Sequence, residues 1–230
     1  MEKEKTKTSS SGSVSFNVSD TDNYNIKPYV KADGKYWYLD EDDRWVDLGL
    51  SVLWAKYNVG ASSPEEYGGY YAWGETETKS SYTLENYRHA TITGYDEYGD
   101  PYYDYNYIGN DISGTQYDVA HVKWGNGARM PRFAEINELL NYCSWTVSTY
   151  YGVKGMTVTG PNGNSIFLPF AGYRDYDGPY EAGYYGCYWS GTIYEANYYA
   201  YSLYFFDDGD RFWDGSNRIC GCSVRPVTEK

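Results

Sequence analysis

Tyrosine is the residue that most constrains how this chain can fold, because 31 of its 230 residues are tyrosines. A buried tyrosine hydroxyl needs a hydrogen-bond partner, so this many rings cannot all lie in a dry core. Aromatic residues together make up 20% of the chain, about half of its apolar fraction of 41%. We therefore predict that many rings lie at or near the surface, and exposed rings in quantity are typical of recognition surfaces.

The charge of the chain excludes two classes of partner. It carries 32 acidic against 19 basic side chains, a formal net charge of −13. This charge repels phosphate backbones and anionic membranes, so we expect no nucleic-acid partner. No apolar stretch approaches the ~20 residues that span a bilayer, and residues 1–13 contain no signal-peptide core, so the chain as given predicts no membrane insertion.

The length allows one compact domain and a small N-terminal appendage. Residues 1–13 are polar and charged, and we predict a disordered tail there. Residues 14–44 show period-two patterns and a strong turn signal at Asp33-Gly34, which predict a small β-hairpin module. Residues 45–230 then form the main domain.

Two helices are expected in the main domain. Ser63 can cap a helix in which Pro64 occupies the first position and Glu66 completes a capping box. A second helix should follow Pro131, because apolar residues recur there at helical spacing. Between them, residues 94–107 are rich in Tyr, Asp and Gly, which favours a surface loop over strands.

The strands that we expect are short. Residues 153–159 and 165–170 flank a turn and should pair as a hairpin. Further strands are predicted at residues 185–189, 198–206 and 223–227. Short mixed strands combined with two helices predict the α+β class and argue against a wound parallel sheet.

The chemistry-bearing residues form no catalytic or metal-binding pattern. Four cysteines fit no zinc spacing, and we expect free thiols, although one or two disulfides stay possible. The run Phe206–Asp210 lacks the spaced ligands and closing Glu of a calcium loop, so a solvated acidic turn is expected. His89 and His121 lie in no nucleophile motif. The sequence therefore predicts no metal and no cofactor.

Several motifs together carry a resemblance. They include V-D-L-G-L-S-V-L-W-A at 46–55, N-V-G-A-S-S-P-E-E-Y-G-G-Y-Y-A-W-G-E at 58–75, N-S-I-F-L-P-F-A-G-Y-R at 164–174 and G-C-S-V-R-P-V at 221–227. Jointly they resemble the major paralogous domain family of gut bacteria, whose members include the variable proteins of diversity-generating retroelements. The resemblance implies a C-type-lectin-like fold of the formylglycine-generating-enzyme subtype. It also implies ligand binding and no enzymatic activity, outside the cell, at a cell surface or on a phage particle.

In such variable proteins, rewriting of AAC codons changes surface positions near the C-terminus while the scaffold persists. Carried over by motif, the candidate ligand-binding positions are Asp175, Asp177, Tyr184, Tyr185, Cys187, Gly191, Thr192, Ser202, Tyr204, Phe206, Asp208, Asp210, Phe212, Asp214, Ser216, Asn217, Ile219 and Cys222. Their ligand would be a protein or a glycan. Two alternatives stay open, a fixed carbohydrate-binding lectin and an enzyme of the formylglycine-generating type, whose cysteine pair has no match here.

The strand at residues 201–206 makes a prediction about burial, because alternate side chains of a strand point to opposite faces. We assign Tyr201, Leu203 and Phe205 to the core. The opposite face should be exposed and should gather Tyr184, Tyr185, Ser202, Tyr204, Phe206 and Phe212. We expect Trp189 and Val224 to be buried, and Arg225 to pair internally.

Overall fold

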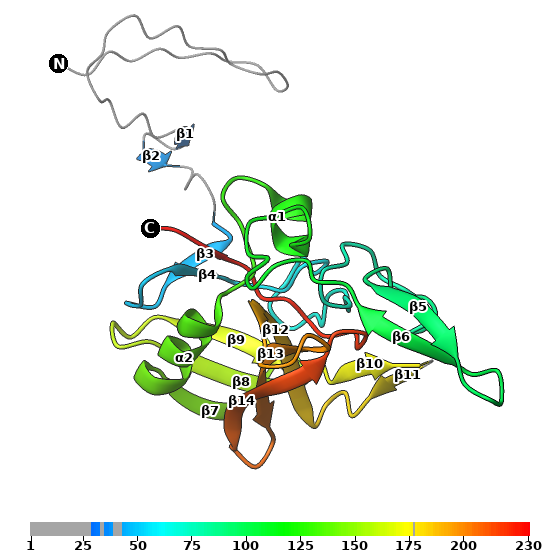
Figure 1. Ribbon diagram of the computed structural model, residues 1–230. Helices are drawn as coiled ribbons and strands as arrows, with labels where there is room; N and C mark the ends of the chain where they lie inside the picture. Colours follow the sequence, from blue (N-terminus) through cyan, green and yellow to red (C-terminus); the bar gives the residue numbers. More distant parts are fainter. Residues whose placement is uncertain (1–28, 33–34, 39–42, 177) are drawn as a thin grey trace, which may run out of the picture. The chain divides into compact units, whose positions relative to one another are not determined.

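The computed structural model describes residues 29–32, 35–38, 43–176 and 178–230 (Figure 1). They belong to two units, Met1–Asp42 and Asp43–Lys230, which we treat separately. In the first unit, β1 (Tyr29–Ala32) and β2 (Lys35–Tyr38) pair antiparallel. The tail predicted at 1–13 and the turn at Asp33-Gly34 lie outside the described residues.

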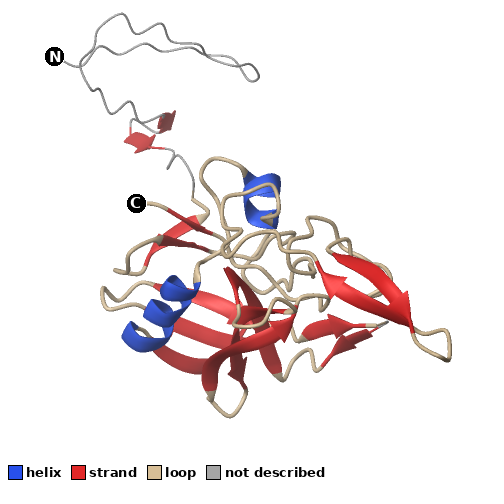
Figure 2. Ribbon diagram, viewed as in Figure 1, coloured by secondary structure: helices blue, strands red, loops and turns tan. Residues whose placement is uncertain are grey.

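The second unit is mainly β, as the ribbon coloured by secondary structure shows (Figure 2). Its strands pair antiparallel in small sheets, and none of the sheets formed by the described residues closes on itself. In the described part of the chain, the only helices are α1 (Val119–Trp124) and α2 (Phe133–Tyr142), of 6 and 10 residues. The predicted α+β class is therefore wrong.

Three sheets have three strands each, and two further pairs are hairpins. The strands are β3 (Trp45–Asp47), β4 (Leu53–Ala55), β5 (Ala90–Tyr95), β6 (Pro101–Tyr105), β7 (Ser144–Tyr150), β8 (Val153–Thr159), β9 (Ser165–Pro169), β10 (Tyr173–Asp175), β11 (Gly178–Tyr180), β12 (Tyr185–Ile193), β13 (Tyr199–Phe206), β14 (Arg211–Asn217) and β15 (Val227–Thr228). The hairpin predicted at 153–170 is confirmed as β8 and β9.

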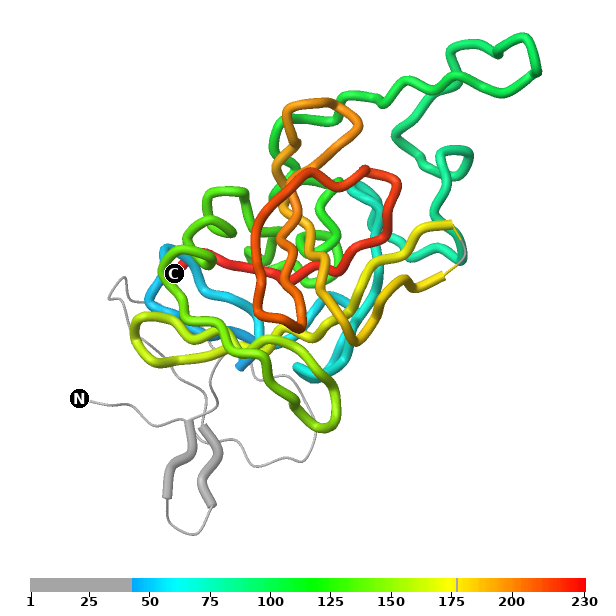
Figure 3. The backbone as a smooth tube through the Cα atoms, turned by 90° about the horizontal axis from the view of Figure 1, so that it is seen from below, coloured from blue at the N-terminus to red at the C-terminus, as the bar shows by residue number. Residues whose placement is uncertain are grey.

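Two local predictions fail for identifiable reasons. The expected helix at Ser63–Glu66 is a single turn, in which the Glu66 carboxylate accepts hydrogen bonds from Ser62 and Gly68 follows with φ of +74°. The expected loop at 94–107 is the β5–β6 hairpin, whose turn is closed by the Asp96 carboxylate. This hairpin projects away from the other strands of the unit in both views (Figures 1 and 3).

The sheet β12-β13-β14 separates two core clusters. Leu203, Phe205 and Tyr188 point into the first, with α2, β8 and β9. Cys187, Trp189 and Ala200 point into the second, which the chain's loop segments and α1 complete. Successive residues of a strand point to opposite faces, and one cluster lies on each face, so both faces of the central strands are largely covered.

The predicted strand register is confirmed in part. Leu203 and Phe205 are 2% and 0% exposed, and Trp189 and Val224 are buried as predicted. Ser202 and Tyr185, expected to be exposed, are also buried. Ser202 lies between Trp189 on β12 and Asp214 on β14, in the part of the sheet that the second cluster covers.

Two buried arginines are paired inside the fold, and the internal pairing predicted for Arg225 is confirmed. Arg225 donates to Asn58 Oδ1 at 2.8 Å and to the carbonyls of Ala55, Lys56 and Phe167. Arg218 is fully buried and donates to the Tyr87 hydroxyl at 3.0 Å, among other acceptors. Buried guanidinium groups of this kind need several acceptors to offset their desolvation.

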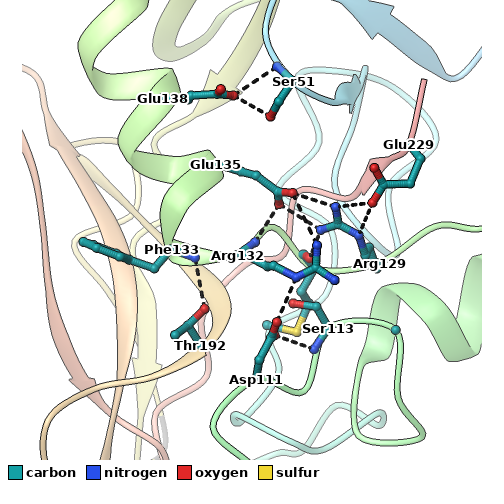
Figure 4. Close-up of polar contacts among 12 residues, drawn as sticks. Ser51, Asp111, Ser113, Arg129, Arg132, Phe133, Glu135, Glu138, Thr192 and Glu229 are labelled. Carbon is teal, nitrogen blue, oxygen red and sulfur yellow. Dashed lines mark hydrogen bonds and ion pairs between the residues drawn. The ribbon is translucent and has the colours of Figure 1, made fainter.

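Polar contacts connect the N-terminus of helix α2 to Arg129 and to strand β12 (Figure 4). The Glu135 carboxylate accepts hydrogen bonds from both terminal nitrogens of the buried Arg129, at 2.8 and 2.6 Å. It also accepts one from the backbone N–H of Arg132, at 2.8 Å. The N–H of Phe133 donates to Thr192 Oγ1 on β12 at 3.0 Å. Among the described residues, no helix is long and apolar enough to cross a bilayer.

His89 makes the fold sensitive to acid. Burial lowers the pKa of its ring below the ordinary value of 6.5, and Nε2 donates to the Gly74 carbonyl. As the pH falls through 6.5, the unfolded chain binds the proton before the folded chain does, so stability is lost. The variant His89→Gln keeps a hydrogen-bond donor but does not titrate. We expect the wild type to have a higher Tm than this variant at about pH 7.5, and the difference to shrink as the pH falls to about 5.5. An advantage independent of pH in parallel thermal melts would contradict this.

Candidate functional site

Six aromatic rings form a continuous row across two neighbouring sheets. The row begins at Tyr180 on β11 and Tyr173 on β10, 5.5 Å apart between ring centroids, and continues to Tyr185 on β12 at 6.1 Å. It then includes Tyr204 and Phe206 on β13 and Phe212 on β14. We call these six residues the aromatic row.

The register of the strands explains why the rings meet. Tyr185 lies opposite Phe206, and Tyr204 lies opposite Phe212. Directly opposed residues of an antiparallel pair place their side chains on the same face and in contact. The ring centroids of Tyr185 and Phe206 are 5.3 Å apart, and those of Phe206 and Phe212 are 5.7 Å apart.

Exposure increases toward the ends of the row. Tyr180 and Phe212 are 43% and 46% exposed, whereas Tyr185 in the middle is only 7% exposed. Tyr173, Tyr204 and Phe206 are half-buried. The rings thus shield one another, while the two at the ends of the row stay open to solvent.

A pocket of about 260 Å³ opens within the row. Three tyrosines of the row line it, together with thiols and small polar groups. Its lining residues are Tyr173, Tyr185, Cys187, Tyr204, Gly215, Ser216, Asn217, Cys220 and Cys222. The pocket therefore offers aromatic, hydroxyl, amide and thiol groups, and none of these described lining residues carries a carboxylate or an imidazole.

The polar groups at the floor of the pocket are connected. The Tyr204 and Ser216 hydroxyls form a hydrogen bond, and Ser216 Oγ lies 3.7 Å from Cys187 Sγ. Burial raises the pKa of both Tyr204 and Tyr185, so their hydroxyls stay protonated near neutral pH. The site can stack against a flat or apolar ligand surface and exchange hydrogen bonds with it.

A second hollow adjoins the row at Phe212. This groove of about 610 Å³ lies between α2 and the turn that joins β13 to β14. Its lining combines two amides, one cation, one carboxylate and two rings. The residues are Asn137, Leu140, Asn141, Gly209, Asp210, Arg211, Phe212 and Trp213.

The structure brings eight of the eighteen sequence-predicted positions into the row and its pocket. They are Tyr185, Cys187, Tyr204, Phe206, Phe212, Ser216, Asn217 and Cys222. Asp210 lines the groove, and Asp208 lies in the exposed turn beside it. Asp214 is exposed on the edge strand β14.

The other positions lie apart from the row. Gly191 is buried, and a Cβ there would come within 2.1 Å of Ser113 Oγ, while Thr192 caps α2. Ser202 is buried, and Ile219 packs against a third cluster. The remaining described positions are the exposed Tyr184 and the half-buried Asp175. Asp177 lies outside the described residues.

Sequence reasoning missed residues that complete the site. Tyr173 and Tyr180 extend the row, and Gly215 and Cys220 line the pocket. Trp213, which is not among the predicted positions, is 39% exposed and lines the groove. The tyrosine-rich composition of residues 173–204 was the available signal for the two tyrosines, but it does not rank one tyrosine above another.

No family model, no curated protein and no solved structure gave a significant match to the chain.

Proposed function

We propose that this chain is a ligand-binding protein that recognises a protein or a glycan through the aromatic row and has no catalytic role. The observation that carries the proposal is the row itself. Six rings from five strands lie 5.3 to 6.4 Å from their neighbours between centroids, and three of them line one pocket. Tyrosine gives a large contact area and freezes few rotamers on binding, which is why binding surfaces are rich in it.

Charge narrows the ligand class. The chain carries a net charge of −13, and Asp208, Asp210 and Asp214 are exposed around the end of the row. Anionic ligands would be repelled, and neutral or basic surfaces would be favoured. The motifs that resemble the variable proteins of diversity-generating retroelements support a display role, outside the cell, at a cell surface or on a phage particle.

A fixed carbohydrate-binding lectin is the second candidate, and the groove at α2 favours it. Sugars stack on aromatic rings and hydrogen-bond to amides and carboxylates, and the groove offers Trp213, Asn137 and Asp210 for these contacts. The two candidates share Phe212. A reverse-transcriptase gene and a near-duplicate of the 3′ coding region beside this gene would favour the variable display protein, and their absence would favour the lectin.

Binding should depend on the row and not on tyrosine exposure in general. The wild type is screened against a glycan array and a displayed protein library, and the affinity of each hit is measured for Phe212→Ala and Tyr204→Ala. We expect each variant to lose roughly 1–3 kcal/mol of binding free energy, about 5–150-fold in Kd, because aromatic anchors dominate interfaces.

Tyr98→Ala is the matched control. Tyr98 is 83% exposed and lies on the turn of the β5–β6 hairpin, outside the row. Its replacement should leave Kd unchanged. Equal losses in Tyr98→Ala and Phe212→Ala, or retained binding in both row variants, would refute the proposed surface, and Trp213→Ala then separates the groove from the row.

A further inference from the structure

Two buried cysteines meet at the floor of the pocket. The Sγ atoms of Cys187 and Cys222 are 2.8 Å apart, and both side chains are almost completely inaccessible. Cys187 belongs to β12, and Cys222 lies 35 positions later in the C-terminal segment. Both are free thiols in the structure.

The backbone fixes this approach of the two sulfurs. The N–H of Ser223 donates to the Cys187 carbonyl at 3.1 Å, and the N–H of Trp189 donates to the Ser223 carbonyl at 3.0 Å. On its other side, Cys222 pairs with Tyr71 through two backbone hydrogen bonds. The two cysteines are therefore held side by side by neighbouring chain segments and not by a chance side-chain rotamer.

We propose that Cys187 and Cys222 are an oxidation site that closes to a disulfide at the floor of the aromatic pocket, by exchange with a low-molecular-weight disulfide. A disulfide bond is about 2.05 Å long, so closure needs the sulfur atoms to move by less than about 1 Å. Both cysteines line the pocket but are 1% and 0% exposed, so a small oxidant meets them most readily during folding, before the pocket floor is buried.

The two thiols differ in the groups that surround them. Burial alone would raise the pKa of the Cys187 thiol, but hydrogen bonds from Cys222, Ser216 and Tyr204 to its sulfur outweigh burial and lower it. Burial raises the pKa of Cys222 well above its ordinary value. The thiolate is the reactive form in exchange, and Cys187, whose sulfur lies 3.7 Å from Ser216 Oγ and 2.8 Å from Cys222 Sγ, is taken as the attacking thiol.

The exchange balances in two displacements. The Cys187 thiolate attacks one sulfur of the oxidant RSSR, which breaks its S–S bond and releases RS⁻. Cys222 gives its proton to RS⁻ and attacks the Cys187 sulfur of the mixed disulfide, which forms the Cys187–Cys222 bond and releases the second RS⁻. This RS⁻ takes up the proton that Cys187 lost to solvent when it ionised. Two protein thiols are oxidised and one RSSR is reduced to two RSH.

The other two cysteines are poorer reactants. Burial raises the pKa of Cys220 to about 12, and Asp175 adds to the shift. Burial also raises the pKa of Cys143 to about 11, and this residue packs in the first core cluster with α2. The link to Cys222 would join β12 to the C-terminal segment and hold the pocket floor beneath Tyr185 and Tyr204.

Peptide mapping tests the bond directly. The full-length chain is incubated with hydroxyethyl disulfide, both folded and during refolding from denaturant, then alkylated in denaturant and digested with trypsin without reduction. We expect a linked pair of the peptides 175–211 and 219–230, with a mass lower by two hydrogen atoms than their sum. Cys143, in the peptide 133–154, should be alkylated.

The peptide 219–230 holds both Cys220 and Cys222, so two variants decide between them. Cys220→Ser should keep the link and Cys222→Ser should lose it. The linked wild type should melt roughly 5–15 °C above the reduced protein, since disulfides that close loops of this size stabilise the folded state. Full alkylation of Cys187 after both treatments, or loss of the link in Cys220→Ser, would overturn the proposal.

Discussion

Replacement of Phe205 by alanine is expected to lower the free energy of unfolding by about 3–5 kcal/mol, the range for large aromatic deletions in a core. Phe205 is completely buried, and its ring packs 5.3 Å from Tyr188 and 5.8 Å from Trp145 and Phe170, between centroids. The ring also covers Gly186, where a Cβ would come within 2.2 Å of it. Alanine would leave a cavity that these neighbours cannot close. Urea denaturation followed by intrinsic fluorescence gives the value.

Phe212→Ala is the control for Phe205→Ala, since it removes the same ring from the row. Phe212 is 46% exposed and lies on the edge strand β14, so its loss should cost less than about 1 kcal/mol. The two variants should therefore differ by several degrees in Tm while Phe212→Ala loses ligand binding. Similar destabilisation by both would mean that the row is part of the core.

Strand positions were predictable where the sequence alternates and a turn follows. β8 and β9 were found because Pro161 to Asn164 gives a clear turn signal between two apolar runs, and β13 was found from the alternation at 201–206. β14, with the sequence R-F-W-D-G-S-N, was missed, because four of its seven residues have polar side chains and six of the seven are at least partly accessible on an edge. Edge strands carry little periodic signal.

The helix error has a different origin. Ser63 to Glu66 has good capping chemistry, but no apolar stripe follows that could be buried, and Gly68 and Gly69 end the segment. α1 begins instead after Asp118, whose carboxylate accepts the N–H groups of Ala120 and His121. Caps mark the ends of a helix, but packing of an apolar face stabilises it.

The sequence predicted that the site would be rich in aromatic residues, but it identified only some of the residues that form it. Tyr204 and Phe206 follow from strand alternation, so one face of β13 could be assigned from the sequence, whereas Phe212 was named only through the motif resemblance. Ser202 belongs to the same face, yet it is buried, because segments far apart in the sequence, which include Tyr71 and Cys222, cover that end of the sheet. Alternation predicts which face of the sheet a side chain points to, but it does not predict which distant segments of the chain cover that face.

The second large loss of stability is expected when the buried ion pair at the start of α2 is broken. Arg129 and Glu135 are buried and make a two-pronged contact (Figure 4). Arg129 also exchanges two backbone hydrogen bonds with Val227. Glu135→Met should lower the free energy of unfolding by about 3–5 kcal/mol, because it leaves a buried guanidinium without its main partner. Chemical denaturation of the purified variant measures the loss.

The double variant Arg129→Met/Glu135→Met distinguishes the pair from ordinary packing. Met is close in length to both side chains, and replacing a buried pair by apolar residues of similar volume is often neutral or stabilising. We therefore expect the double variant to be more stable than Glu135→Met alone, with a coupling energy of roughly 1–3 kcal/mol in the double-mutant cycle. Glu229, which also accepts from Arg129 but is largely exposed, should contribute less than about 1 kcal/mol in Glu229→Gln. Strictly additive losses would show that the two charges stabilise the fold independently, and the contact seen between them would then carry no coupling.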